Sequence, residues 1–393
     1  MQIRNVHPFP ARMAPELALN SLQALAKGST ILDPMSGSGT VLRQAAELGH
    51  HAVGFDMDPL AVLMSKVWTA PVDKADVEQE MLAVLKDASL LDPESCVLPW
   101  QDEETLRFIS YWFDTPQQHA LSALAFALNV RRSRVGSVKS EAVLNVLQVA
   151  LSRIIVTKEQ AASLARDTSH SRPHRVSLKS TYDVFSNFSK SVQQLVRRLD
   201  SQPNQIVSVN VGDARAIKLN DCSVDAVVTS PPYLNAIDYM RGHRMSLVWL
   251  GHSISELRSI RSNSVGAERA ADKQTDTRSD EVVKAMCDVD LLLRRHQMMI
   301  HRYAIDLIEM LGEVSRVLKV GAHATYVVGN SCLKESFIRN SDGVGRAGEV
   351  AGLILINSVE RELPMGSRYL PMTINGSLSK RMRTETVLTF KKV

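Results

Sequence analysis

A run of five residues, Thr229-Ser230-Pro231-Pro232-Tyr233, contains the side chains best suited to chemistry in this 393-residue chain. Two adjacent prolines fix φ and remove two backbone donors, so the carbonyls of this turn are left to accept hydrogen bonds. The Ser230 hydroxyl and the Tyr233 ring flank those carbonyls. Such a turn could accept hydrogen bonds from an amino group on a flat ring while the aromatic side chain stacks on that ring. The exocyclic amine of a nucleobase fits this description.

A second group of residues combines glycines with acids. The segment Asp33-Pro-Met-Ser-Gly-Ser-Gly39-Thr40 follows a short apolar run, and Asp56 comes 17 residues after Gly39. The glycines would let the backbone approach a ligand closely, and the N-terminus of a following helix would offer free N–H groups. Asp56, at the end of the next strand, could bond a ribose diol. Glycine turns paired with such an acid occur in both dinucleotide and adenosyl binders.

Three details favour an adenosyl ligand. The third glycine of the dinucleotide fingerprint is missing, because Val41 and Leu42 follow Thr40. Asp33 precedes the glycines, where it suits an amino-acid ammonium better than a pyrophosphate. Asp213 ends a later strand and could accept a hydrogen bond from an adenine amine. Methionine moiety, ribose and adenine would each meet a carboxylate, and we therefore expect S-adenosylmethionine as the cofactor.

These residues need a scaffold that brings strand ends together, and the apolar pattern predicts one. Strands alternating with helices favour an α/β fold with a Rossmann-like, doubly wound sheet, which binds ligands at the carboxyl ends of its strands. The last two strands predict an antiparallel C-terminal hairpin. The expected strands cover residues 29–33, 51–55, 205–211, 224–228, 324–328, 353–359 and 385–391, and the expected helices include one after residue 40 and one over 294–318.

Between residues 70 and 204 the pattern changes to helical spacing. The expected helices are 75–91, 117–130, 141–165 and 184–199, and the polar, basic segment 166–175 should be a loop. We therefore predict a catalytic domain formed by residues 1–69 and 205–393, and a helical insertion over 70–204. A further polar stretch, at about 262–283, is expected to be a mobile loop.

The insertion carries most of the positive charge. Residues 131–198 include 13 Lys or Arg and 4 Asp or Glu, a balance of +9, whereas the whole chain has a net charge of +4. A basic module on a slightly acidic body predicts a polyanionic partner, although a solvated helix face explains the charge about as well.

Composition narrows the class of protein. A hydrophobic content of 45% with 22% charged residues is typical of a globular protein with a sizeable core. Its four cysteines are far apart and form no CxxC pair, which disfavours a disulfide framework or a structural zinc site. No apolar run is long enough for a membrane span, and residues 1–5 lack the apolar core of a signal peptide, so a cytoplasmic location is expected.

The two motifs make the chain similar to the S-adenosylmethionine-dependent amino-methyltransferases of DNA. That family's cofactor motif, usually Asp-Pro-Phe-x-Gly-Ser-Gly-Thr, corresponds to residues 33–40, with Met35 in place of Phe. Its catalytic Ser/Asn/Asp-Pro-Pro-Tyr corresponds to residues 230–233. The segment His7-Pro-Phe-Pro-Ala-Arg12 resembles its additional cofactor-wall motif. The resemblance covers residues 1–65 and 205–393 and is weak over 70–204.

The resemblance implies a class I methyltransferase fold and a set of site residues. The implied catalytic residues are Ser230, Pro231, Pro232 and Tyr233. The implied cofactor contacts are Pro10, Asp33, Pro34, Ser36, Gly37, Gly39, Thr40, Asp56, Asp213 and Ala214. No metal is required. Ser at the first position of the catalytic motif goes most often with cytosine N4 in the family and Asp with adenine N6, so a cytosine-N4-specific enzyme is favoured over an adenine-N6 one.

Double-stranded DNA is the expected partner, with a cognate restriction endonuclease or other defence-system proteins as further partners. The expected DNA contacts are Arg131, Arg132, Arg172, Arg175, Arg241 and Arg244. Two alternatives stay open: an RNA amino-methyltransferase, and a non-catalytic nucleic-acid-binding protein that keeps the fold. A nicotinamide dehydrogenase is disfavoured, since the third glycine is missing and the Pro-Pro turn would have no role.

Overall fold

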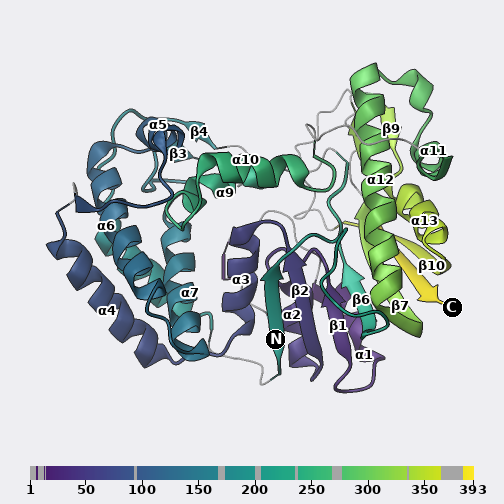
Figure 1. Ribbon diagram of the computed structural model, residues 1–393, viewed down its shortest axis with the longest axis horizontal. Coiled ribbons are helices and arrows are strands. Elements are labelled where there is room, and N and C mark those ends of the chain that lie inside the picture. Colours follow the sequence, from purple (N-terminus) through teal and green to yellow (C-terminus); the bar gives the residue numbers. More distant parts are fainter. Residues whose placement is uncertain are drawn as a thin grey trace.

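The computed structural model contains a seven-stranded sheet on one side and a helical lobe on the other (Figure 1). It describes residues 6–7, 13, 15–92, 95–166, 173–199, 205–234, 238–267, 277–333, 336–363 and 384–393. Within these ranges no helix has the length and apolar character needed to cross a membrane.

The strand order of the large sheet is β10-β11-β7-β6-β1-β2-β5. The five strands from β7 to β5 are mutually parallel, while β11 runs antiparallel to both β7 and β10. This order confirms the predicted doubly wound α/β sheet with an antiparallel C-terminal hairpin. The strands are β1 Thr30–Asp33, β2 His51–Asp56, β5 Val207–Val211, β6 Val224–Thr229, β7 Leu318–Gly329, β10 Leu353–Glu362 and β11 Thr384–Lys392.

Helices cover both faces of the sheet, because successive strand residues send apolar side chains to opposite sides. Leu32 and Val227 belong to a core shared with α11, α12 and α13, whereas Ile31 and Val228 belong to a core shared with α1 and α2. These helices are α1 Pro15–Gln23, α2 Thr40–Glu47, α11 Thr277–Met286, α12 Arg294–Val317 and α13 Asn340–Val350. The short elements η2 Val289–Leu291, β8 Ser331–Leu333 and β9 Ser336–Ile338 lie among them in sequence.

The helical lobe has its own hydrophobic core, to which α3 and α9 also contribute buried side chains. Its helices are α4 Lys74–Leu90, α5 Glu103–Trp112, α6 Thr115–Arg132, α7 Val138–Arg153 and α8 Val184–Val196. The two strands β3 Ala165–Arg166 and β4 His174–Arg175 pair antiparallel. Two-residue strands thus form both ends of the segment 166–175, which was expected as a loop, and residues 167–172 of it lie outside the described ranges. The division into two domains stays a prediction.

Two expectations about helices were wrong. The helix expected over 141–165 ends at Arg153, and the chain then folds back so that the Ala162 N–H donates to the Ile154 carbonyl. Ala161, Ala162 and Leu164 are buried outside any helix, which explains their helix-like apolar pattern. The polar stretch at 262–283 contains the end of α10 Ile254–Asn263 and most of α11, whose Val282, Val283 and Met286 are buried. The remaining two helices are α3 Pro59–Thr69 and α9 Met240–Leu247.

Candidate active site

The predicted site residues meet at one edge of the sheet. Strands β1, β2, β5 and β6 are neighbours and parallel, so the turns that follow them leave from the same edge. Asp33 ends β1, Asp56 ends β2, Asp213 follows β5 by two residues, and Ser230 follows β6 directly. This is the edge at which open α/β sheets bind ligands.

Asp33 joins the glycine turn to the catalytic turn. Its side chain is buried, and its Oδ1 accepts hydrogen bonds from the Met35 N–H at 3.2 Å and from the Thr229 hydroxyl at 2.7 Å. Burial raises the pKa of this carboxyl to about 7, although the bond from Thr229 opposes the shift. A cationic ligand group near Asp33 would restore its ionised form.

The glycine turn has a backbone conformation that favours glycine. Gly37 and Gly39 have φ of 50° and 89°, and a Cβ on Gly39 would lie 2.7 Å from Ser65 Oγ and 3.0 Å from Ser65 Cα. Glycine is therefore required at Gly39 by both its backbone conformation and its neighbours. The Ser65 hydroxyl donates to the Gly37 carbonyl at 2.9 Å. Pro34, Ser36 and Thr40 are buried in the same turn.

The residues present fit an adenosyl cofactor in two respects. Ser36 Oγ is buried and finds no hydrogen-bond partner among the described residues, so it is available to a ligand. Asp56 is held in place by N–H groups of Gly37, at 2.8 Å, and Asp58, at 2.9 Å, one on each carboxylate oxygen. A carboxylate has further lone pairs, so these bonds orient Asp56 and still leave acceptors for a ribose diol. Burial, followed by the charge of Asp58, raises the pKa of Asp56 to about 6.

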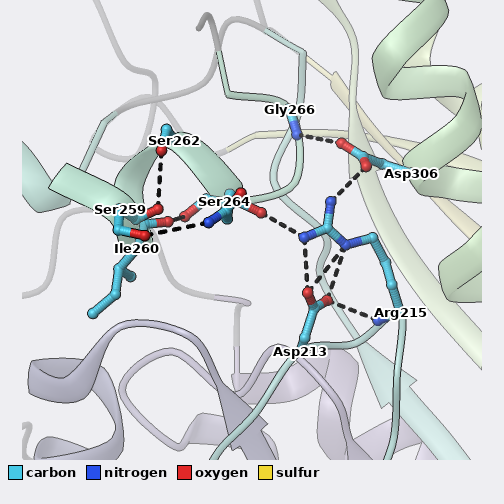
Figure 2. A network of polar contacts seen from close by, with 9 residues as sticks. Asp213, Arg215, Ser259, Ile260, Ser262, Ser264, Gly266 and Asp306 are labelled. Carbon is cyan, nitrogen blue, oxygen red and sulfur yellow. Dashed lines mark hydrogen bonds and ion pairs between the residues drawn. The ribbon is translucent and has the colours of Figure 1, made fainter. Parts of the chain in front are cut away.

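Asp213 has a partner that the sequence did not reveal. The Arg215 guanidinium donates to both of its carboxylate oxygens, at 3.0 and 2.8 Å, and reaches Asp306 of α12 at 2.6 Å (Figure 2). An adenine amine would therefore have to share Asp213 with Arg215. Ala214 is buried beside it.

Two polar groups of the catalytic turn have hydrogen-bond partners that the sequence did not predict. The Ser230 hydroxyl donates to the Val327 carbonyl of β7 at 3.0 Å. The Tyr303 hydroxyl of α12 donates to the Pro232 carbonyl at 2.9 Å, which corrects the expectation that this carbonyl is free. No hydrogen bond from the described residues reaches the Pro231 carbonyl, and the Tyr233 ring is half-buried.

The arginines expected to contact DNA divide into two groups. Arg131 pairs with Glu80 at 2.5 Å and with Asp87 at 2.7 Å, and Arg132 donates to Gln148 at 2.7 Å. These two side chains hold the helices of the lobe together, which is a structural role that the charge count could not distinguish from DNA contact.

The second group lies on aromatic rings or beside Asp238. Arg244 lies over the Phe108 ring and Arg175 over the Tyr111 ring, at 5.1 and 5.0 Å. Arg241 lies 3.6 Å from Asp238, which also binds Arg261 at 2.6 Å. Burial, followed by the charge of Arg261, lowers the pKa of Arg244. Of the remaining predicted site residues, Arg172 and Pro10 lie outside the described ranges.

Sequence reasoning missed three groups that contact the site: Tyr303, Arg215 and the buried pair of His243 and Asp58. His243 Nδ1 lies 2.5 Å from Asp58 Oδ2, which ties α9 to the turn after β2. The spacing of Arg215 two residues after Asp213 was visible, but its third partner, Asp306, is 91 residues away.

In a comparison with known proteins, the sequence of this chain is similar to type II methyltransferases. It is 22% identical to M.MvaI of Kocuria varians, in a match that covers 98% of this chain and 90% of that protein. It is also 22% identical to M.BsoBI of Geobacillus stearothermophilus over 66% of this chain, but the match spans only 55% of that protein's length. No family model matches.

Solved structures give a weaker likeness. A geranyl diphosphate C-methyltransferase of Streptomyces coelicolor A3(2) is 9% identical, with a TM-score of 0.36 over 96% of this chain and 78% of that one. A protein of Thermus thermophilus, described as a DNA modification methylase without proof of activity, is 17% identical, with a TM-score of 0.23 over 46% and 50%. These scores are too low to inform the function. In its sequence, the chain is similar to type II methyltransferases.

Proposed function

We propose that this protein is a DNA methyltransferase that transfers a methyl group from S-adenosylmethionine to the exocyclic N4 amine of cytosine at a specific site. The observation that carries the proposal is the hydrogen bond from the Ser230 hydroxyl to the Val327 carbonyl. A serine hydroxyl has one proton, and here that proton is used. Ser230 therefore presents only acceptor lone pairs to a ligand, and such a group pairs with an amine and not with a ring carbonyl.

The acceptors address a chemical difficulty of the substrate. The lone pair of an exocyclic amine is delocalised into its ring, so the amine is a poor nucleophile. Hydrogen bonds from the amine to Ser230 Oγ and to the Pro231 carbonyl favour a more tetrahedral nitrogen with a localised lone pair. Catalysis then rests on positioning and on fixed dipoles. Tyr233 supplies a stacking surface for a base that has left the duplex.

The cofactor supplies an electrophilic methyl group on a sulfonium. Asp33 would hold the ammonium of its methionine moiety, Asp56 the ribose hydroxyls, and Ser36 a further polar atom. Asp213 and Ala214 would border the adenine. The hydrogen bond between Asp33 and Thr229 supports this arrangement, because it fixes the cofactor turn directly against the residue before Ser230.

DNA as the substrate rests on the relatives, since type II methyltransferases act in restriction–modification systems. The arginines at 241 and 244 of α9 and at 261 of α10 would bind phosphates. A cognate restriction endonuclease is the partner that such a role implies. Adenine N6 is the second candidate for the methylated position, because Ser230 would accept hydrogen bonds from that amine equally well.

The test is methyl transfer from tritiated S-adenosylmethionine to duplex DNA, single-stranded DNA and tRNA, followed by nucleoside analysis. We expect label in N4-methylcytosine from duplex DNA. Label in N6-methyladenine would overturn the assignment of the base. Label in tRNA alone would overturn DNA as the substrate, and binding of nucleic acid without any transfer would favour the non-catalytic alternative.

A further inference from the structure

Helix α12 contacts the catalytic turn through a buried tyrosine. Tyr303 has no exposed surface, and its hydroxyl donates to the Pro232 carbonyl at 2.9 Å. Burial raises the pKa of this phenol, so the hydroxyl keeps its proton and stays a donor. The Pro231 carbonyl, which faces the substrate amine in the proposed reaction, belongs to the preceding peptide. The Pro232 ring fixes φ between the two peptides, so a hydrogen bond at the Pro232 carbonyl also restricts the Pro231 carbonyl.

One turn further along, α12 contacts the cofactor side of the site. Asp306 is three residues after Tyr303, so the two side chains lie on the same face of the helix. Asp306 is buried and accepts a hydrogen bond from Arg215 at 2.6 Å. The same guanidinium binds Asp213 and the Asn263 carbonyl, at 2.5 Å, so it joins the end of β5, the end of α10 and α12 (Figure 2).

The loop after α10 links these two contacts. The Gly266 N–H donates to Asp306 at 3.3 Å, as Figure 2 shows, and Gly266 has φ of 73°. A Cβ on Gly266 would lie 3.4 Å from the Tyr303 ring and 3.8 Å from the Tyr233 carbonyl oxygen. Glycine thus lets the loop pack against both the catalytic turn and α12. Tyr303, Asp306, Arg215 and Gly266 form one assembly across the site.

We propose that Tyr303 and Arg215 are positioning residues for methyl transfer: Tyr303 orients the catalytic turn, and Arg215 orients Asp213 for the adenine of the cofactor. Helix α12 connects the two residues, because it carries both Tyr303 and Asp306, and Asp306 accepts the hydrogen bond from Arg215. This inference rests on the proposed function. It assigns the two residues different kinetic signatures, since one acts on the turn that holds the substrate and the other on the cofactor.

The first test replaces Tyr303 by Phe, which removes only the hydroxyl. Loss of one buried hydrogen bond predicts a kcat about tenfold lower, with the Kd for S-adenosylmethionine changed by less than about twofold. Tyr326→Phe is the matched control, because Tyr326 is also fully buried and its hydroxyl has no hydrogen-bond partner among the described residues. A Tyr303→Phe variant with the kcat of the wild type would overturn the role of Tyr303, as would an equal loss in Tyr326→Phe.

The second test replaces Arg215 by Lys, which keeps the charge but cannot span the three segments. The expected result is a Kd for S-adenosylmethionine about fivefold to tenfold higher by calorimetry, with kcat at saturating cofactor within about twofold of the wild type. Arg316→Lys is the control, since Arg316 binds Glu313 and Asp221 near the other end of α12. An unchanged Kd in Arg215→Lys, or an equal rise in Arg316→Lys, would overturn the role of Arg215.

Failure of the inference and failure of the proposed function give different results. A wild-type protein that binds S-adenosylmethionine but methylates no DNA contradicts the proposed function, whereas an active wild type with unaffected variants contradicts only the inference. The melting temperature of each variant shows whether a change in kcat or Kd comes instead from a loss of folded protein. If Tyr303 and Arg215 only stabilised the fold, their variants would have lower melting temperatures, but Tyr303→Phe would not selectively lower kcat and Arg215→Lys would not selectively raise the Kd.

Discussion

At the carboxyl edge of the sheet, the buried Asp33 and the half-buried Asp56 have raised pKa values. In the helical lobe, by contrast, the arginine at the basic end of α6 is paired with acids of the same lobe. Asp33 and Asp56 receive hydrogen bonds from hydroxyl and backbone donors, and no arginine or lysine pairs with either among the described residues. Arg131, by contrast, has two carboxylate partners, Glu80 and Asp87. The first arrangement is costly for the protein alone and becomes favourable with a cationic ligand; the second is already satisfied.

The difference teaches how to interpret charge in this chain. The excess of positive charge over residues 131–198 does not by itself locate a DNA surface, because Arg131 and Arg132 bind side chains of neighbouring helices. The candidate arginines outside that range, Arg241, Arg244 and Arg261, lie on α9 and α10. Figure 1 shows α10 running from the helical lobe towards α12.

The largest expected effect compares two serine hydroxyls that donate to backbone carbonyls, one in each region. Ser230 donates to Val327 at the sheet edge, and Ser191 donates to the Ala150 carbonyl between α8 and α7 at 2.9 Å. Ser230→Ala removes an acceptor for the substrate amine, and we expect kcat to fall by about 100-fold, as for other preorganised polar groups at a reacting centre. Ser191→Ala removes a hydrogen bond of the same kind from the lobe and should lower stability without lowering kcat.

Single-turnover rates at saturating cofactor and DNA measure the effect on kcat, and thermal unfolding measures the effect on stability. Equal rates for the two variants would show that the Ser230 hydroxyl has no part in the reaction. The contrast between a sheet edge that takes part in the reaction and a lobe that only stabilises the fold would then not hold at Ser230.

The sheet edge was more predictable than the lobe for a physical reason. Residues 33–40 and 230–233 are local motifs, in which backbone constraint and chemistry lie within a few residues of each other. The doubly wound sheet followed from apolar runs that alternate with helices, whereas the order of its strands was not predicted. The roles of Tyr303 and Arg215 could not be predicted, because their partners are 71 and 91 residues away in the chain.

In the helical lobe, packing overrode local pattern. Ala161, Ala162 and Leu164 continue the apolar spacing of α7, but they are buried in a segment that turns back on Ile154 and Ile155. Periodicity reports burial, and it reports a helix only when the chain also continues straight. The ion pairs of Arg131 could not be predicted from local pattern either, because its partners Glu80 and Asp87 belong to a different helix, α4.

A smaller effect is expected on DNA affinity, and it distinguishes the two groups of arginines. Arg244→Ala removes a cation from α9, and we expect DNA affinity to fall about fivefold to tenfold, with the slope of log K against log salt reduced by about one. Arg131→Ala should leave DNA affinity and its salt slope unchanged and should lower the melting temperature by about 2 °C. Fluorescence anisotropy with a DNA duplex over a series of salt concentrations measures the slopes.

The reverse result, with Arg131→Ala weakening DNA binding and Arg244→Ala leaving it intact, would return the DNA surface to the helical lobe. Equal effects on binding would show that both regions contact the duplex. Either result would contradict the division of roles drawn from the ion pairs of Arg131.

The smallest expected effect is a pH dependence that originates at the sheet edge. The pKa of Asp33 is about 7 and that of Asp56 about 6 in the cofactor-free protein, above the ordinary value of 3.8. Between about pH 4 and 7 the folded protein therefore binds protons that the unfolded chain does not, so these two groups lower stability as pH rises through that window. A cationic cofactor favours the ionised form of Asp33, so its binding releases a proton and becomes tighter with rising pH.

We expect the Kd for S-adenosylmethionine to be about threefold higher at about pH 6.5 than at about pH 7.5. Calorimetry in two buffers with different ionisation enthalpies measures both the Kd and the proton released. Asp33→Asn should bind more weakly at every pH and lose most of this dependence, because the amide cannot ionise. A wild-type Kd that stays constant over this range, with no proton release, would mean that Asp33 does not face the positive end of the cofactor. The acid would then serve only to accept the Thr229 hydroxyl, and the sheet edge would resemble the helical lobe, with its charge used to hold the fold.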